Sequence, residues 1–326
     1  MKITDIEQAL RERPGDRQLW LDYAALLEER GDARGTLIRL EQRRDRLRPV
    51  DRVGVQQEID ELASAHRQAW DAALPDGATV LARRHGFATK VAVEWSDEDD
   101  APMLVDRVLR EPFVTALRIS PTEDIEQAEV EAAGEQAWEA FDDGADAGQE
   151  TDAPEPSIDP GALATLDFSR LSELGFPYLG LGALGAKALA ASAFFRIGAS
   201  GTGPTAGDTT GLLDSLDLRY SRIGNDGLSA LAASPGFRGV RRLHLQHNRL
   251  TAKAARDLHR FTNLTELDLR YNTIGEEGAQ ALLAAPFIGS LRRLLLHRAD
   301  ISDAGAKLLA DSPRLPPAIR SYWRNA

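Results

Sequence analysis

Histidine, aspartate, arginine and tyrosine recur at fixed offsets in the C-terminal part of this 326-residue chain, at positions that alternate with leucine. Imidazoles beside carboxylates can bind a metal ion or transfer a proton. Tyrosine and arginine, in contrast, are the side chains that dominate protein–protein interfaces. The recurring residues, which are the candidate site residues of the chain, are Asp217, Arg219, Tyr220, His244, Gln246, His247, Asp268, Arg270, Tyr271, His297 and Arg298.

A catalytic or metal-binding interpretation starts from His244 and His247, which could lie beside Asp217 or Asp268 because neighbouring strands are about 4.8 Å apart. Such chemistry normally requires a desolvated pocket, which polar residues on the open face of a sheet do not form. The chain has no cysteine, so a disulfide, a cysteine zinc site and a thiol nucleophile are excluded. No H-E-x-x-H, P-loop, G-x-S-x-G or G-x-G-x-x-G pattern stands in a suitable context. The sequence therefore predicts no enzyme activity, no catalytic residue, no metal site and no cofactor.

Four copies of one short pattern must position these residues. The pattern is an apolar residue, two variable residues and then L-x-L. The copies begin at Leu213, Val240, Leu264 and Leu291. In each copy the apolar period changes from 2 to 3.6 residues, which predicts one strand followed by one helix.

This pattern resembles leucine-rich repeats of the ribonuclease-inhibitor-like type, whose period it matches. The resemblance implies an α/β solenoid with a curved parallel sheet inside and helices outside. The consensus leucines would then point into the core, and the residues between them would line the concave face. Asn248 and Asn272 hold the ninth position of their repeats, where a buried amide can satisfy the backbone of the turn that leaves the strand.

Another copy stands upstream, because the segment 181–195 aligns without gaps on 223–237. Its strand is expected at Leu163–Phe168, which would add Asp167, Ser169 and Arg170 to the concave columns. An earlier strand is expected at Val114–Ile119. Since single repeats cannot bury their apolar side, stacking of the copies must form the core.

Helices are expected near the N-terminus, the first opened by Thr4 and the second capped by Asp16. The phrase that runs from Tyr23 to Glu41 is similar to a small helical repeat-companion domain found beside repeat arrays in bacteria, namely myxobacteria and planctomycetes. This resemblance adds an architecture rather than an activity. Eight arginines between Arg30 and Arg52 are either a basic patch for polyanions or a solvated helix face with ion pairs.

The predicted organisation is a helical domain over 1–74, an N-terminal capping repeat over 75–120, an acidic and largely disordered insertion over 121–160, and a solenoid over 161–326 whose C-terminal cap ends in a strand at 318–323. The insertion contains 14 Asp or Glu and no Lys or Arg. Since the whole chain has a net charge of −12, the residues outside the insertion sum to +2 (−12 + 14). Within it, Trp138 and Phe141 either anchor the segment on its own chain or form a docking motif. A second insertion, 198–211, is expected to be a flexible loop.

The function predicted from these features is a cytoplasmic, non-catalytic scaffold that binds a protein partner through its concave strands and is monomeric alone. The chain start lacks the apolar run of a secretory signal, and no stretch reaches the roughly 18 apolar residues of a membrane span. Two alternatives stay open. One is polyanion or nucleic-acid binding by the arginine-rich helices, with the acidic insertion as an autoinhibitor. The other is an inhibitory or regulatory subunit of an enzyme.

Overall fold

The computed structural model describes residues 2–95, 101–121, 159–192 and 213–325. Contacts divide the chain into two compact units. The N-terminal unit contains Met1–Ala92 and Leu104–Ala116, and the repeat unit contains Leu117–Gly201 and Gly211–Ala326 with the short piece Val93–Met103. The finer division at residues 74, 120 and 160 stays a prediction.

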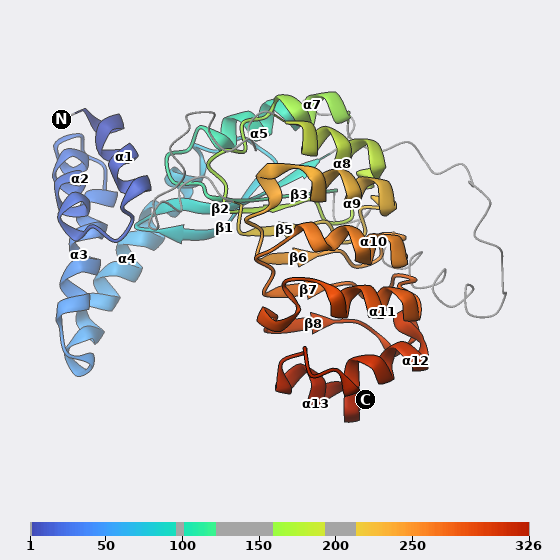
Figure 1. Ribbon diagram of the computed structural model, residues 1–326. Coiled ribbons are helices and arrows are strands. Elements are labelled where there is room, and N and C mark those ends of the chain that lie inside the picture. Colours follow the sequence, from blue (N-terminus) through green and yellow to red (C-terminus); the bar gives the residue numbers. More distant parts are fainter. Residues whose placement is uncertain (1, 96–100, 122–158, 193–212, 326) are drawn as a thin grey trace. The chain divides into compact units, whose positions relative to one another are not determined.

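Helices open the N-terminal unit and a pair of strands follows them (Figure 1). The elements are α1 (Ile3–Glu12), α2 (Arg17–Glu29), α3 (Arg34–Arg46), the 3-10 turn η1 (Pro49–Asp51), α4 (Arg52–Asp71), β1 (Ala78–Arg84), β2 (Phe87–Trp95) and α5 (Ala101–Leu109). The Asp16 carboxylate accepts the backbone N–H groups of Gln18 and Leu19, both at 3.1 Å, so the predicted cap of α2 is confirmed. The predicted start at Thr4 is wrong, because α1 begins one residue earlier with Lys2 as its N-cap.

Aromatic rings from separate elements form the core of the N-terminal unit. Trp20 and Tyr23 of α2 are buried beside Phe87 of β2 and Phe113. The Phe113 ring centroid lies 5.2 Å from that of Trp20 and 5.0 Å from that of Phe87. Large buried rings contribute most of the apolar area in a small domain. This cluster therefore joins the helices to the strand that follows them.

Parallel strands and helices alternate in the repeat unit. The strands are β3 (Ala116–Pro121), β4 (Glu173–Gly175), β5 (Ser215–Asp217), β6 (Arg242–His244), β7 (Glu266–Asp268) and β8 (Arg293–Leu295). The helices are α7 (Pro160–Thr165), α8 (Gly182–Ala191), α9 (Gly224–Ala233), α10 (Ala252–Asp257), α11 (Gly275–Ala284), α12 (Arg298–Asp311) and α13 (Pro317–Asn325), with 3-10 turns η3 (Pro235–Phe237), η4 (Leu258–Arg260) and η5 (Ile288–Ser290). From β4 to β8 each strand pairs in parallel with the next, and helices α8 to α12 lie on one side of this ladder (Figure 1). The predicted α/β repeat fold with an N-terminal helical region is confirmed.

The register of the ladder places the central leucine of each repeat opposite the next. The aligned leucines are Leu174, Leu216, Leu243, Leu267 and Leu294. All five are buried, and burial of one leucine side chain contributes about 1.5–3 kcal/mol. On the helix side, a Cβ at Gly227 would lie 2.9 Å from the Cβ of Ala186. Neighbouring helices α8 and α9 therefore approach closely only because this position is glycine.

The two ninth-position asparagines are buried and satisfy the turn backbone as predicted. The Asn248 amide donates to the carbonyl oxygens of Leu218 at 2.7 Å and Gln246 at 3.1 Å. The Asn272 amide donates to the carbonyl of Leu245 at 2.9 Å. Because the bonds to Leu218 and Leu245 cross from one repeat to its neighbour, the asparagines join consecutive turns.

Two predicted strands are wrong. Residues Pro160–Thr165 form helix α7, started by the Asp159 side chain, which accepts the Gly161 N–H at 2.8 Å. The strand of this repeat is β4, eight residues further on, so Asp167, Ser169 and Arg170 do not belong to the strand columns. The expected final strand at 318–323 is part of helix α13, which buries Ile319 and Trp323 on one side. That spacing of four residues suits a helix rather than a strand.

Some predicted features lie outside the described residues. They are nearly all of the acidic insertion 121–160, including Trp138 and Phe141, and the second insertion 198–211. Pro121, the first residue of the predicted insertion, is described and is the last residue of β3. In the parts of the chain that the structure describes, no helix combines the length and the apolar character needed to cross a membrane.

Candidate functional site

The strand ladder places one column of candidate residues side by side. Asp217 pairs with His244, and His244 pairs with Asp268. At the ends of the column, Gly175 stands opposite Asp217 and Leu295 opposite Asp268. The predicted neighbourhood of two aspartates and one histidine is therefore present.

Each aspartate of this column is the last residue of its strand and binds the arginine two residues later in its own repeat. Asp217 accepts the Arg219 Nε at 2.9 Å and its Nη2 at 2.7 Å. Asp268 accepts the Arg270 Nε at 3.0 Å and its Nη2 at 2.7 Å. Bidentate carboxylate–guanidinium pairs are stronger and more directional than single ion pairs. The arginines are thus fixed along the strands, and their charge is neutralised locally.

Asp268 and Gln246 are buried, with 1% and 7% of their surface exposed. The Gln246 amide donates to Asp268 Oδ2 at 2.6 Å. Since a buried carboxylate needs both hydrogen bonds and a counter-charge, Gln246 and Arg270 together stabilise Asp268. The polar atoms of Gln246 and Asp268 thus bind groups within the protein, and they hold Arg270 in place.

Four rings follow the strand exits of four consecutive repeats, and we call Tyr178, Tyr220, His247 and Tyr271 the strand-exit row. The ring centroids of Tyr178 and Tyr220 are 4.7 Å apart at an interplanar angle of 18°. Those of Tyr220 and His247 are 5.0 Å apart at 24°. Stacked rings at this spacing stabilise one another by about 0.5–1.5 kcal/mol beyond their burial.

Backbone hydrogen bonds between repeats set the spacing of this row. The backbone N–H of Tyr178 donates to the Arg219 carbonyl at 2.8 Å, and that of Tyr220 donates to the Gln246 carbonyl at 2.9 Å. The N–H of His247 donates to the Arg270 carbonyl at 3.0 Å. The parallel ladder thus continues past the short strands, and the rings inherit its spacing.

The backbone of the strand-exit row is left-handed. The φ angles are 62° at Tyr178, 56° at Tyr220, 51° at His247 and 59° at Tyr271. For residues other than glycine this conformation costs roughly 1–2 kcal/mol per residue. Strain of this kind persists where the surrounding structure fixes it, and it gathers at functional sites. The row is therefore a rigid array of aromatic side chains.

The electrostatic surroundings of the row are positive near His247. Burial, and then the charges of Arg222 and Arg249, lower the pKa of His247 below its ordinary value, which favours the neutral imidazole. Burial, and then the neighbouring phenols of Tyr178 and Tyr271, raise the pKa of Tyr220. At neutral pH the rings of Tyr220 and His247 are therefore uncharged and lie near guanidinium groups.

The last repeat departs from the predicted columns. His297 is the N-cap of α12 and its backbone N–H donates to Asp300 Oδ2 at 2.6 Å. Arg298 opens that helix and its Nε donates to Asp303 at 2.6 Å. The His297 ring still lies near Tyr271, with centroids 4.7 Å apart. His297 therefore extends the row, whereas Arg298 belongs to the end of the solenoid.

A second set of charges crosses the strands at their first residues, and the predicted columns did not contain it. Arg242 Nη2 lies 2.8 Å from Glu173 Oε1 and 3.0 Å from Asp214 Oδ2. Arg293 Nη1 lies 3.0 Å from Glu266 Oε1. The alternation of sign over Arg242, Glu266 and Arg293, the first residues of three consecutive strands, was the available signal. These pairs are partly exposed, so they stabilise the ladder only modestly.

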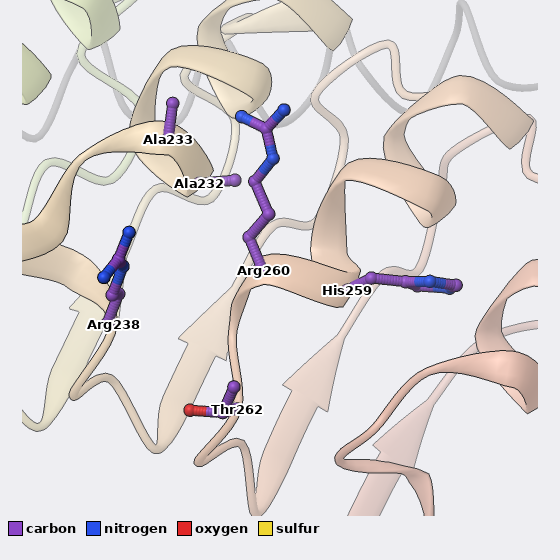
Figure 2. A pocket seen from close by; sticks show the side chains of 6 residues that line it. All are labelled: Ala232, Ala233, Arg238, His259, Arg260 and Thr262. Atoms are coloured by element: carbon purple, nitrogen blue, oxygen red, sulfur yellow. The ribbon is translucent and has the colours of Figure 1, made fainter.

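The structure groups no three histidine, aspartate or glutamate side chains in a way that could hold a metal ion, within the residues it describes. A shallow pocket lies instead on the helix side, lined by Ala232, Ala233, Arg238, His259, Arg260 and Thr262 (Figure 2). The His259 side chain extends away from Arg238 (Figure 2) and its Nε2 contacts the Ala281 carbonyl at 2.7 Å. Arg260 is the last residue of η4, and Ala233 is the last residue of α9. Cations at helix C-termini are stabilising by themselves, so these side chains have a structural explanation.

Comparison with known families supports the repeat assignment. Residues 212–232 and 262–283 match the family described as Leucine Rich repeat. No curated protein matches the chain. The C-terminal half of the chain thus carries leucine-rich repeats, a module that generally mediates protein interactions.

Proposed function

We propose that this protein is a non-catalytic scaffold or adaptor that binds a partner protein on the open strand face and strand exits of its repeats. The strand-exit row is the observation that carries the proposal. It presents rings from four consecutive repeats on a backbone that is already fixed. Because little conformational freedom remains to be lost, such a surface binds at a low entropic cost.

The exposed member of the row indicates where contact would begin. Tyr271 keeps 46% of its surface exposed although large hydrophobic side chains nearby are buried. Tyrosine is enriched at interfaces because it combines a large apolar ring with a polar end. We therefore assign direct contact to Tyr178, Tyr220, His247 and Tyr271, and a supporting role to the paired residues Asp217, Arg219, Gln246, Asp268 and Arg270.

The test is capture of partners by the full chain from its own cells, with quantitative mass spectrometry, followed by binding measurements with the purified partner. The variant replaces Tyr178, Tyr220 and Tyr271 by alanine. The control is Tyr322→Ala, which removes a tyrosine that is 59% exposed on α13. We expect the triple variant to weaken binding at least 100-fold and the control to retain it. Equal binding by both variants would contradict the proposal.

The polyanion alternative has less support from the geometry. Between Arg30 and Arg52, Arg34 is bound to Asp32, Arg39 to Glu28 and Arg48 to Asp51. The remaining pairs in this stretch are Arg43 with Glu58, Arg44 with Asp45, and Arg52 with the Leu47 carbonyl. Six of the eight arginines are thus engaged, which matches a solvated helix face with ion pairs.

An inhibitory or regulatory subunit of an enzyme would use the same surface. The identity of the captured partner separates this role from a passive scaffold. If the partner is an enzyme, its activity is measured with the natural chain and with the tyrosine variant. Inhibition that requires the strand-exit row would assign the regulatory role.

A further inference from the structure

We infer that the free edge of strand β1 binds β1 of a second copy of this chain, with the two strands antiparallel about a twofold axis at Leu81. The inference does not rest on the proposed function, because β1 belongs to the N-terminal unit. It departs from the monomer that the sequence predicts. Two features carry it, namely the unpaired edge of β1 and the self-complementary order of its residues.

The turn between β1 and β2 determines which backbone groups of β1 the hairpin uses. This turn contains only His85 and Gly86, whose φ angles are 54° and 81°. A two-residue loop with both φ angles positive is a type I′ turn. In such a hairpin the flanking residues Arg84 and Phe87 form a hydrogen-bonded pair, and every second residue of β1 before Arg84 is bonded to β2 in the same way.

The backbone groups of the intervening residues, Thr79, Leu81 and Arg83, therefore point away from β2. In the strand order β1 stands at one end, beside β2. Among the described residues, no backbone hydrogen bond from a turn or loop reaches these three positions. An edge of this kind is a template for pairing with another strand.

The usual protection of an edge strand is missing from β1. Proteins protect such edges with proline, with a bulge or with charged side chains that stand along the edge. The strand reads Ala-Thr-Val-Leu-Ala-Arg-Arg, and both of its arginines are bound within their own chain. Arg83 donates to the Gly86 carbonyl at 3.1 Å, and Arg84 donates to the Pro14 carbonyl at 2.6 Å. Leu81, in contrast, keeps 48% of its surface exposed.

The order of residues suits a second copy of the same strand. Leu81 is the centre of the seven-residue strand and also one of its outward-facing residues. An antiparallel pair about Leu81 therefore places Thr79 opposite Arg83 and Leu81 opposite itself, so every outward N–H and C=O group gains a partner. The arginine end of one copy then lies beside the start of the other, which follows Asp76. Parallel pairing would instead place the arginines of both copies side by side, which is unfavourable.

The expected dimer is reversible. A single pair of strands buries less than the roughly 1,000 Å² that stable interfaces require, so we expect half-dissociation at about 10–100 µM. A dimer carries two copies of the repeat unit. It would therefore bind more tightly to a partner that has two binding segments.

The first experiment is disulfide cross-linking, which is clean because the chain has no cysteine. Opposite residues of a hydrogen-bonded antiparallel pair have Cα atoms about 5.5 Å apart, which a disulfide can span. The full-length Leu81→Cys protein is oxidised mildly at about 100 µM, near the upper end of the expected range, and separated on a non-reducing gel. The control is Ala82→Cys, an exposed neighbour that would lie opposite Val80 of the second copy and too far from its own equivalent.

The second experiment is sedimentation equilibrium of the natural chain and of Leu81→Lys, which would set two like charges opposite each other at the axis. Its control is Leu184→Lys, the same change at a leucine of α8 that is 63% exposed. Melting temperatures are recorded for all three proteins, because both leucines are exposed and neither change should lower them.

We expect Leu81→Cys to form at least ten-fold more cross-linked dimer than Ala82→Cys. Leu81→Lys should weaken dimerisation at least ten-fold, and Leu184→Lys should dimerise as the natural chain does. A natural chain that stays monomeric at about 100 µM, equal cross-linking by the two cysteine variants, or a dimer that Leu81→Lys leaves unchanged would each overturn the inference.

Discussion

Asn272 Oδ1 accepts the backbone N–H of Asn248 at 2.9 Å and that of Leu250 at 3.0 Å, so one buried amide closes the turn of the preceding repeat. Its Nδ2 donates to three carbonyl oxygens as well. A buried donor or acceptor left without a partner costs about 1–3 kcal/mol. The stability of the repeat unit therefore depends strongly on this side chain.

We expect Asn272→Ala to lower the free energy of unfolding by about 3 kcal/mol or more, since several backbone groups lose their partner at once. Urea denaturation followed by circular dichroism measures the change. The matched control is Asn263→Ala, because Asn263 is exposed and its amide makes a single bond of 3.3 Å to the Arg238 carbonyl. A loss below 1 kcal/mol for Asn272→Ala would contradict the asparagine's role.

The two arginine–aspartate pairs should differ in their contribution to stability. The Asp268 side chain is 2% exposed and that of Asp217 is 24% exposed, while both arginines are 33% exposed. Removal of one partner from a buried pair leaves an uncompensated charge. We expect Arg270→Ala to cost about 2–3 kcal/mol and Arg219→Ala less than about 1 kcal/mol, measured by urea denaturation at pH 7. Equal losses would show that burial of Asp268 does not decide the energetics.

A pH dependence follows from His247. Its pKa in the folded protein lies below the ordinary value of 6.5, because burial and then Arg222 and Arg249 disfavour the charged ring. The unfolded chain therefore binds more protons as the pH falls through 6.5, and the folded state loses stability in that window. Above pH 6.5 this contribution is constant.

The measurement compares urea denaturation at pH 7.5 and pH 5.5 for the natural chain and for His247→Phe, which keeps a ring beside Tyr220. We expect the natural chain to lose more stability on acidification than the variant does. Other groups titrate equally in both proteins, so the difference between them isolates His247. The same loss in both would exclude His247 as the titrating group.

The repeat architecture could be predicted because leucine spacing determines which side chains can share a core. The strand of the repeat before Leu213 could not be placed by that pattern alone. Leu163–Phe168 and Leu171–Phe176 both satisfy it. The alignment of Leu181 with Ile223 implies an offset of 42 residues, which would have selected Leu171, and the observed pairing of Leu174 with Leu216 has that same offset. The same offset would have placed Tyr178 in the strand-exit row, at the position equivalent to Tyr220.

The pairing within the site could not be predicted from spacing, because it depends on side-chain rotamers. The side chains of Asp217 and Arg219 are two residues apart and point to the same side of the backbone. From the sequence alone, each could equally bind a partner protein or bind the other. The structure shows that both oxygens of the carboxylate are used by the arginine. Similarly, the burial of Asp268 depends on Gln246 of the neighbouring repeat.

Two helical glycines of the N-terminal unit should respond in opposite ways to alanine. A Cβ at Gly35 in α3 would lie 2.5 Å from the Ala24 carbonyl oxygen, whereas a Cβ at Gly54 in α4 would meet no atom within 4 Å. Alanine is favoured over glycine in a helix interior by about 0.5–1 kcal/mol, so Gly54→Ala should raise the free energy of unfolding by that amount. Gly35→Ala should lower it by about 1–3 kcal/mol, because the α2 backbone must move away from α3. Urea denaturation of both variants tests the close packing of these helices, and a stabilised Gly35→Ala protein would show that α2 and α3 are not in contact at this position.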